Sequence, residues 1–261
     1  MALLLCSKRA EKPFYYEKLD LRLWSLQELC YVLYHYPVLV PEDFVDQKLL
    51  QWLREELEMP QLAERLSQLQ HTGADLETLM LRIQRDGNYY TERELNRYSA
   101  ELKRLRDLDS ARLAERLGDT LFRLKRYGRA VAAYRESVTA KKNAAVLLKL
   151  GDAYVTVMQF RKAAAAYEEV YTETHTREPL RKLYYLFRLE PSVDTFSKYK
   201  DEVPEEEQTE WTQDFDSARQ ESADSPGAEK IRKMYEEGGK HFRTAAQEQI
   251  RVWKKAYRAM L

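Results

Sequence analysis

Apolar side chains recur every three or four residues along most of the chain, a spacing typical of amphipathic helices. Five such stretches follow one another between residues 25 and 106. The predicted helices begin after Ser25, near Val45, at Pro60, after Asp75 and after Thr91. Ser25 and Thr91 are each followed by a glutamate three residues on, which is the spacing of a capping box. Short loops imply antiparallel neighbours, so residues 1–106 are expected to form a mostly helical domain.

A different pattern precedes these helices. Phe14-Tyr15-Tyr16 and the alternating leucines from Leu19 to Leu23 predict a short extended segment. The rest of the chain returns to helical spacing.

The most regular pattern is a repeat with a period of thirty-three residues. The first copy contains Leu117, Gly118, Asp119, Tyr127, Ala130, Tyr134 and Glu136. The second copy contains Leu150, Gly151, Asp152, Phe160, Ala163, Tyr167 and Glu169. We expect one helix pair at about 110–125 and 128–141, and another at about 143–157 and 160–173. A weaker third copy has Tyr184 at the glycine position and a shortened second helix around Phe196.

The small residues of the repeat have a steric role. Gly118 and Gly151 lack a Cβ, so the two helices of each unit can approach closely. We expect Tyr134 and Tyr167 to fill the space toward the next unit.

The order Leu-Gly-x-x-aromatic, followed by alanine and a ring at fixed offsets, resembles the tetratricopeptide repeat. Leu150-Gly151-Asp152-Ala153-Tyr154 is the better copy, whereas Leu121 replaces the aromatic residue in the first. Ala114 and Leu147 stand where the family often has tryptophan, and the proline that usually ends the unit is missing. The resemblance implies an all-α fold in which an α-solenoid over residues 107–203 binds a protein or peptide.

In this family the first helix of each unit lines a concave face. By that register the lining residues are Arg112, Glu115, Asp119, Phe122 and Arg123 in the first unit, Ala145, Leu148, Asp152, Val155 and Thr156 in the second, and Glu178, Arg181, Tyr185, Arg188 and Leu189 in the third. The family's clamp for a C-terminal carboxylate needs lysine and asparagine. Glu115 and Asp119 hold those positions here and would repel a carboxylate.

A partner with lysine or arginine side chains, or with an apolar helix face, therefore fits the groove better. On this view, exchanging Asp119 and Asp152 for lysine would weaken partner capture and leave folding intact. The alternative is that both carboxylates only pair with neighbouring arginines on a solvated face.

The segment from Tyr15 to Tyr34 resembles the opening of a group of uncharacterised bacterial proteins that join such a leader to tetratricopeptide repeats. No activity follows from this resemblance, which supports a bacterial origin.

Charge is balanced overall, with 43 basic and 43 acidic side chains, so the excess of positive charge typical of a nucleic-acid-binding protein is missing. Its distribution is uneven. Residues 190–224 hold twelve acidic and three basic side chains, whereas residues 228–261 hold nine basic and four acidic ones. We expect 204–261 to form an acidic helix and a long basic C-terminal helix that pair with each other and cap the array. The alternative is that the basic helix docks on an acidic membrane surface or on nucleic acid.

Residues for catalysis are not evident. Cys6 and Cys30 lie in apolar surroundings, the four histidines lack metal-ligand spacing, and no phosphate-binding loop or nucleophile elbow occurs. We therefore expect a non-catalytic cytoplasmic adaptor without cofactor or metal, which binds a protein or peptide and needs neither nucleic acid nor a membrane. A peptide-sensing regulator and an accessory subunit of an enzyme complex remain alternatives, and a homo-oligomer is possible.

Overall fold

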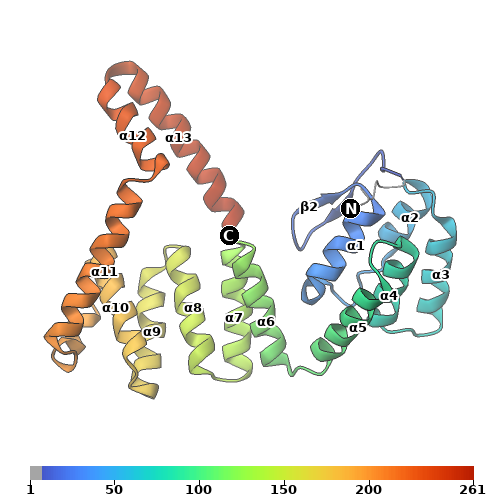
Figure 1. The fold of residues 1–261 in the computed structure, drawn as a ribbon, viewed down its shortest axis with the longest axis horizontal. Coiled ribbons are helices and arrows are strands. Elements are labelled where there is room, and N and C mark those ends of the chain that lie inside the picture. Colours follow the sequence, from blue (N-terminus) through green and yellow to red (C-terminus); the bar gives the residue numbers. More distant parts are fainter. Residues whose placement is uncertain (1–7) are drawn as a thin grey trace. The chain divides into compact units, whose positions relative to one another are not determined.

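The computed structural model describes residues 8–261 (Figure 1), so Cys6 lies outside the described residues. The chain divides into two compact units, residues 1–109 and 110–261. Within the described part, helices dominate and the one sheet has two short strands. The fold is therefore all-α, as the spacing of apolar residues predicts.

The first unit begins with an antiparallel hairpin of β1 (Phe14–Tyr16) and β2 (Leu21–Leu23), which is the predicted extended segment. The hydroxyl of buried Tyr16 donates to the Leu39 carbonyl oxygen at 2.8 Å. This bond joins the hairpin to the 3-10 turn that follows the first helix.

Helices complete the first unit, and all five predicted ones are present. They are α1 (Leu26–His35), α2 (Gln47–Glu55), α3 (Pro60–His71), α4 (Leu76–Gly87) and α5 (Glu92–Arg106), with a 3-10 turn η1 (Pro37–Leu39) after α1. Their inward residues are fully buried: Leu29, Leu33, Leu49, Leu53, Leu62, Leu66, Met80 and Ile83. Thr91 and Glu94 form the complete capping box of α5.

Cys30 belongs to this core. Burial raises the pKa of its thiol to about 12, so the thiolate is not populated near neutral pH. Its sulfur packs where a Cβ on Gly87 would lie. Cys30 is thus a small buried apolar residue, as expected.

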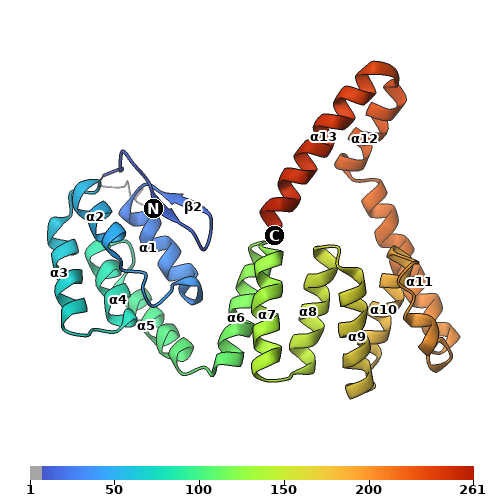
Figure 2. The same ribbon diagram turned by 180° about the vertical axis from the view of Figure 1, so that it is seen from behind.

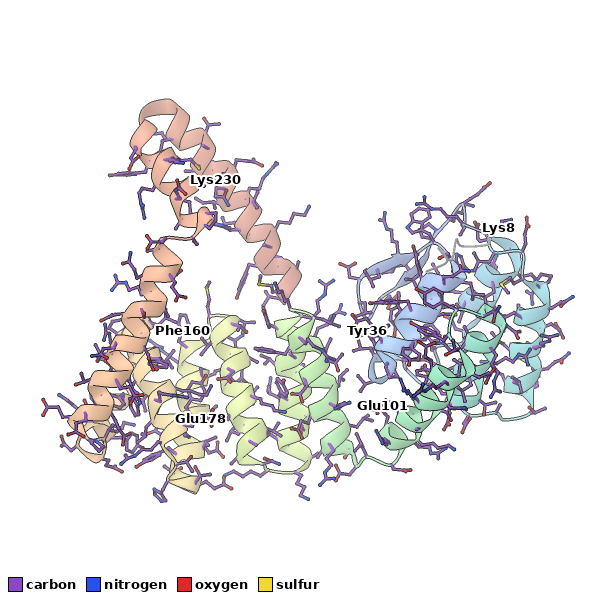
Figure 3. All side chains as sticks on the ribbon, in the orientation of Figure 1. Lys8, Tyr36, Glu101, Phe160, Glu178 and Lys230 are labelled. Atoms are coloured by element: carbon purple, nitrogen blue, oxygen red, sulfur yellow. The ribbon has the colours of Figure 1, made fainter. Side chains whose placement is uncertain are left out.

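The second unit opens with the predicted helix pairs. They are α6 (Ser110–Arg123) with α7 (Tyr127–Ala140), and α8 (Ala144–Thr156) with α9 (Phe160–Thr174), followed by α10 (Arg177–Leu189). Figures 1 and 2 show α6 to α10 side by side in an antiparallel row. In Figure 3, Phe160 at the start of α9 lies at the upper edge of this row and Glu178 at the start of α10 lies at the lower edge, because these two neighbouring helices run in opposite directions.

The third unit departs from a helix pair. A 3-10 helix, η2 (Phe196–Glu202), takes the place of the expected short second helix, and α11 (Glu205–Ala223) then packs along α10. The reason is steric. Tyr184 and Phe196 occupy the places of Gly151 and Ala163, and their rings meet at 5.2 Å between centroids, so a close helix contact is blocked. Buried Trp211 of α11 completes this aromatic cluster.

The end of the chain forms two helices, α12 (Pro226–Glu237) and α13 (Gly239–Met260), which break at Gly238 with a φ of 61°. The last turn of α13 contacts the array, because Tyr257 donates from its hydroxyl to the Val157 carbonyl at 3.1 Å. No described helix has the length and apolar character needed to cross a membrane.

Candidate functional site

Gly118 and Gly151, the two glycines related by the repeat, lie directly under tyrosine rings. A Cβ on Gly118 would come within 2.5 Å of the Tyr134 ring, and one on Gly151 would overlap the Tyr167 ring even more closely. Both tyrosines belong to the second helix of the same unit. Both rings therefore fill space within their own unit. The Tyr167 ring also meets the next unit as expected, because the Lys182 ammonium group lies 5.9 Å from its centroid.

Each ring also orients a carboxylate of the groove. The Tyr134 hydroxyl donates to Asp119 at 2.8 Å, and the Tyr167 hydroxyl donates to Asp152 at 2.7 Å. In the next helix, Lys149 donates to both oxygens of Asp119 at 2.9 Å and to Glu115 at 2.8 Å. Lys182 repeats this arrangement by donating to Asp152 at 2.8 and 3.0 Å.

This Tyr–Asp–Lys arrangement joins three consecutive helices and occurs twice at the repeat offset. Burial first, and then the adjacent carboxylate, raise the pKa of Tyr134 and of Tyr167, so both phenols stay protonated. Partial burial lowers the pKa of Lys149, but its bonds to Glu115 and Asp119 more than offset this effect and leave the pKa raised. In both copies a tyrosine hydroxyl and a lysine ammonium group thus donate to the same carboxylate.

The partners of the two carboxylates differ from those that the alternative interpretation of the sequence names. They pair with lysines, not arginines, and each also accepts a tyrosine hydrogen bond. Lysine at position 119 or 152 would lose both contacts and face a second ammonium group. Exchanging these aspartates would therefore disturb folding, contrary to the expectation from the sequence.

The pattern changes at the third unit, where Tyr185 takes the place of the aspartate. Its hydroxyl lies 3.4 Å from Asp214 of α11. Arg188 donates to Asp216 at 2.7 Å, and its guanidinium lies 5.0 Å from the centroid of the Phe215 ring. Helix α11 thus closes one side of the groove.

An apolar pocket of about 360 Å³ lies between α8, α10 and α11. Its wall is formed by Val155, Tyr185, Leu186, Leu189, Phe215 and Ala218, and its polar border by Asp152, Tyr167, Lys182 and Asp214. Leu189 is 54% exposed, so the pocket presents apolar surface to solvent. Pockets that join an apolar wall to a few oriented polar groups are typical of binding sites.

The other predicted lining residues have varied environments. Glu115 contacts Lys149, and Leu148 is half-buried on α8. The Phe122 ring packs edge-on against Tyr127 at 5.0 Å, at the turn between α6 and α7. Three arginines are exposed on the surface and do not line the pocket: Arg112, Arg123 and Arg181.

Several residues of the site were not predicted. Lys149 and Lys182 have the same offset as the repeat, so the sequence contained their signal. Asp214 and Phe215 lie outside the repeat, so no repeat offset indicates them. Their segment is predicted from its charge to pair with the C-terminal helix.

A larger cavity of about 720 Å³ lies in the first unit between β1 and α2. Its floor includes Phe14, Phe44 and Trp52, whose rings pack on one another, and its rim carries charges of both signs. Among the residues that the structure describes, no group of three or more His, Cys, Asp or Glu side chains is arranged to hold a metal ion.

Comparison with protein-family models, with curated proteins and with solved structures gives no match for this chain.

Proposed function

We propose that the second unit is a tetratricopeptide-like binding scaffold, in which the groove between α8, α10 and α11 holds a segment of a partner protein. The observation that carries the proposal is the open apolar pocket around Val155, Tyr185, Leu189 and Phe215. A catalytic role is not needed to explain this site, because the polar groups on its border form hydrogen bonds and ion pairs with one another.

The partner segment that fits best carries an apolar side chain next to a lysine or arginine. The apolar side chain would enter the pocket. The border carries two carboxylates, Asp152 and Asp214, against one ammonium group, that of Lys182, so its net negative charge favours a basic neighbour. An amphipathic helix presents apolar and basic side chains together, so it is the expected form of the ligand.

Selection from a random peptide library on the full chain tests this proposal. We expect the selected peptides to combine large apolar residues with lysine or arginine. Removing a buried leucine contact typically costs about 1.5–3 kcal/mol, so Leu189→Ser is expected to weaken the binding of these peptides at least about tenfold.

Leu113→Ser is the matched control, because Leu113 is a 40% exposed leucine on α6 that does not line the pocket. Equal binding by the wild-type chain and both variants would refute the pocket as the binding site. Selection of acidic peptides would refute the proposed charge preference.

A further inference from the structure

Helix α13 has two faces of opposite character. One face carries apolar residues at three- and four-residue spacing: Phe242, Ala246, Ile250, Trp253, Tyr257 and Met260. The opposite face carries Arg251, Lys255 and Arg258, and Arg243 and Lys254 lie along the border between the two faces. Residues two positions apart, such as Arg251 and Trp253, point to nearly opposite sides of a helix with 3.6 residues per turn.

The middle of the apolar face is exposed. Phe242 packs edge-on against Tyr235 of α12 at 5.6 Å, and Tyr257 bonds to the array at the other end. Between these contacts, Ile250 is 45% exposed and Trp253 is 50% exposed. Figure 3 shows α12, marked by Lys230, and α13 as a hairpin that joins the array through α11 and the last turn of α13.

The charges of α13 are not directed at α11. Among described side chains, the ion pairs of α11 go to α10, through Arg177 with Glu207 and Arg188 with Asp216. Arg251 pairs with Glu248 of its own helix. The expected pairing between the acidic and basic segments is therefore not found in the described residues, and the second interpretation of the basic helix gains support.

We propose that α13 binds an anionic lipid surface, with Ile250 and Trp253 inserted beneath the headgroups and the basic face directed toward the phosphates. A helix with a continuous apolar face, an aromatic ring and a lysine- and arginine-rich polar face lies in the plane of a bilayer interface. For α13 to contact the lipid surface along its whole length, its last turn must leave the array. Tyr257 and Arg126 hold that turn by bonds to the carbonyls of Val157 and Ala259 at 3.1 and 2.9 Å. This inference is independent of the peptide-binding proposal.

Co-sedimentation of the full chain with vesicles tests the inference. We expect at least about tenfold stronger partition into phosphatidylcholine–phosphatidylserine vesicles than into phosphatidylcholine alone, together with a blue shift of tryptophan emission. Each basic residue near an anionic surface contributes roughly fivefold, so Lys254→Gln with Lys255→Gln should weaken partition on the order of twentyfold.

Two single variants separate insertion from simple charge attraction. Trp253→Glu and Gln247→Glu add the same charge, but on opposite faces of α13. We expect Gln247→Glu to weaken partition no more than about fivefold, and Trp253→Glu to weaken it at least tenfold further because the inserted ring is lost. Circular dichroism would verify that both variants keep the helical content of the wild type.

Three outcomes would overturn the inference. One is that the chain partitions equally into both kinds of vesicle, or into neither. Another is equal loss for the two glutamate variants. The third is the absence of vesicle binding together with self-association or binding to a short DNA duplex, where Trp253→Glu or the lysine variant removes that association. Such a result would assign α13 to contact with a second copy of the chain or with nucleic acid.

Discussion

Tyrosine and glycine act as a pair in this array. The Tyr167 ring covers Gly151 and its hydroxyl reaches Asp152, so one side chain fixes the distance between two helices and the orientation of a groove carboxylate. The same holds for Tyr134 over Gly118. Close packing and groove polarity therefore depend on the same contact.

Adding a methyl group at these glycines is expected to destabilise the array. Alanine favours a helix over glycine by about 1 kcal/mol, but overpacking against a tyrosine ring costs about 1–3 kcal/mol. Gly118→Ala or Gly151→Ala should therefore lower the free energy of unfolding by a net amount on the order of 1 kcal/mol, measured by urea denaturation. Gly227→Ala is the control, since a Cβ there meets no atom within 4 Å. Unchanged or increased stability of both array variants would contradict the close contact.

High pH is expected to weaken the array through the same tyrosines. Folding raises the pKa of Tyr134 and Tyr167, so their contribution is complete below the ordinary tyrosine pKa of about 10 and is lost as the pH rises toward the folded-state values. The free energy of unfolding should fall above about pH 10. In a Tyr134→Phe, Tyr167→Phe variant this fall should be shallower, because the remaining buried tyrosines still contribute. Parallel profiles for the two proteins would argue against the phenol–carboxylate bonds.

At the scale of elements, helix α8 is central, because it supplies Asp152 and Val155 to the groove. Its start is fixed by Asn143, whose side-chain oxygen accepts from the Ala145 and Val146 amides at 2.9 and 3.4 Å. This cap satisfies amide groups that have no partner within the helix.

Removing the cap should therefore destabilise the array. We expect Asn143→Ala to cost about 1 kcal/mol, and Asn143→Asp to cost little because aspartate also caps helices. Thermal or urea unfolding of the second unit would measure both. Equal losses for alanine and aspartate would show that the side-chain oxygen is not the stabilising group.

The elements that the sequence predicted well are those with strong local signals. Capping residues, prolines and the spacing of leucines located α1 to α5, and the repeat located α6 to α9. The third unit was predicted less well, because the replacement of Gly151 and Ala163 by Tyr184 and Phe196 changes how two helices can meet. That consequence depends on contact between distant residues, which periodicity does not report.

At the scale of the whole molecule, the groove also depends on contacts between distant residues that periodicity does not report. Repeat register placed Asp152, Val155 and Tyr185 together, and the structure has all three around one pocket. Phe215 reaches the pocket from α11, a segment whose position depends on the aromatic cluster of Tyr184, Phe196 and Trp211. Charge balance alone suggested that this segment pairs with α13, but its ion pairs go to α10.

Two surfaces of the second unit therefore have separate proposed partners, a basic amphipathic segment for the groove and a lipid surface for α13. The groove is the central claim. Hydrogen–deuterium exchange of the full chain, with and without the strongest selected peptide, tests it most directly. We predict that added protection is confined to α8, α10 and α11, whereas protection confined to α13 or to the cavity between β1 and α2 would contradict the account.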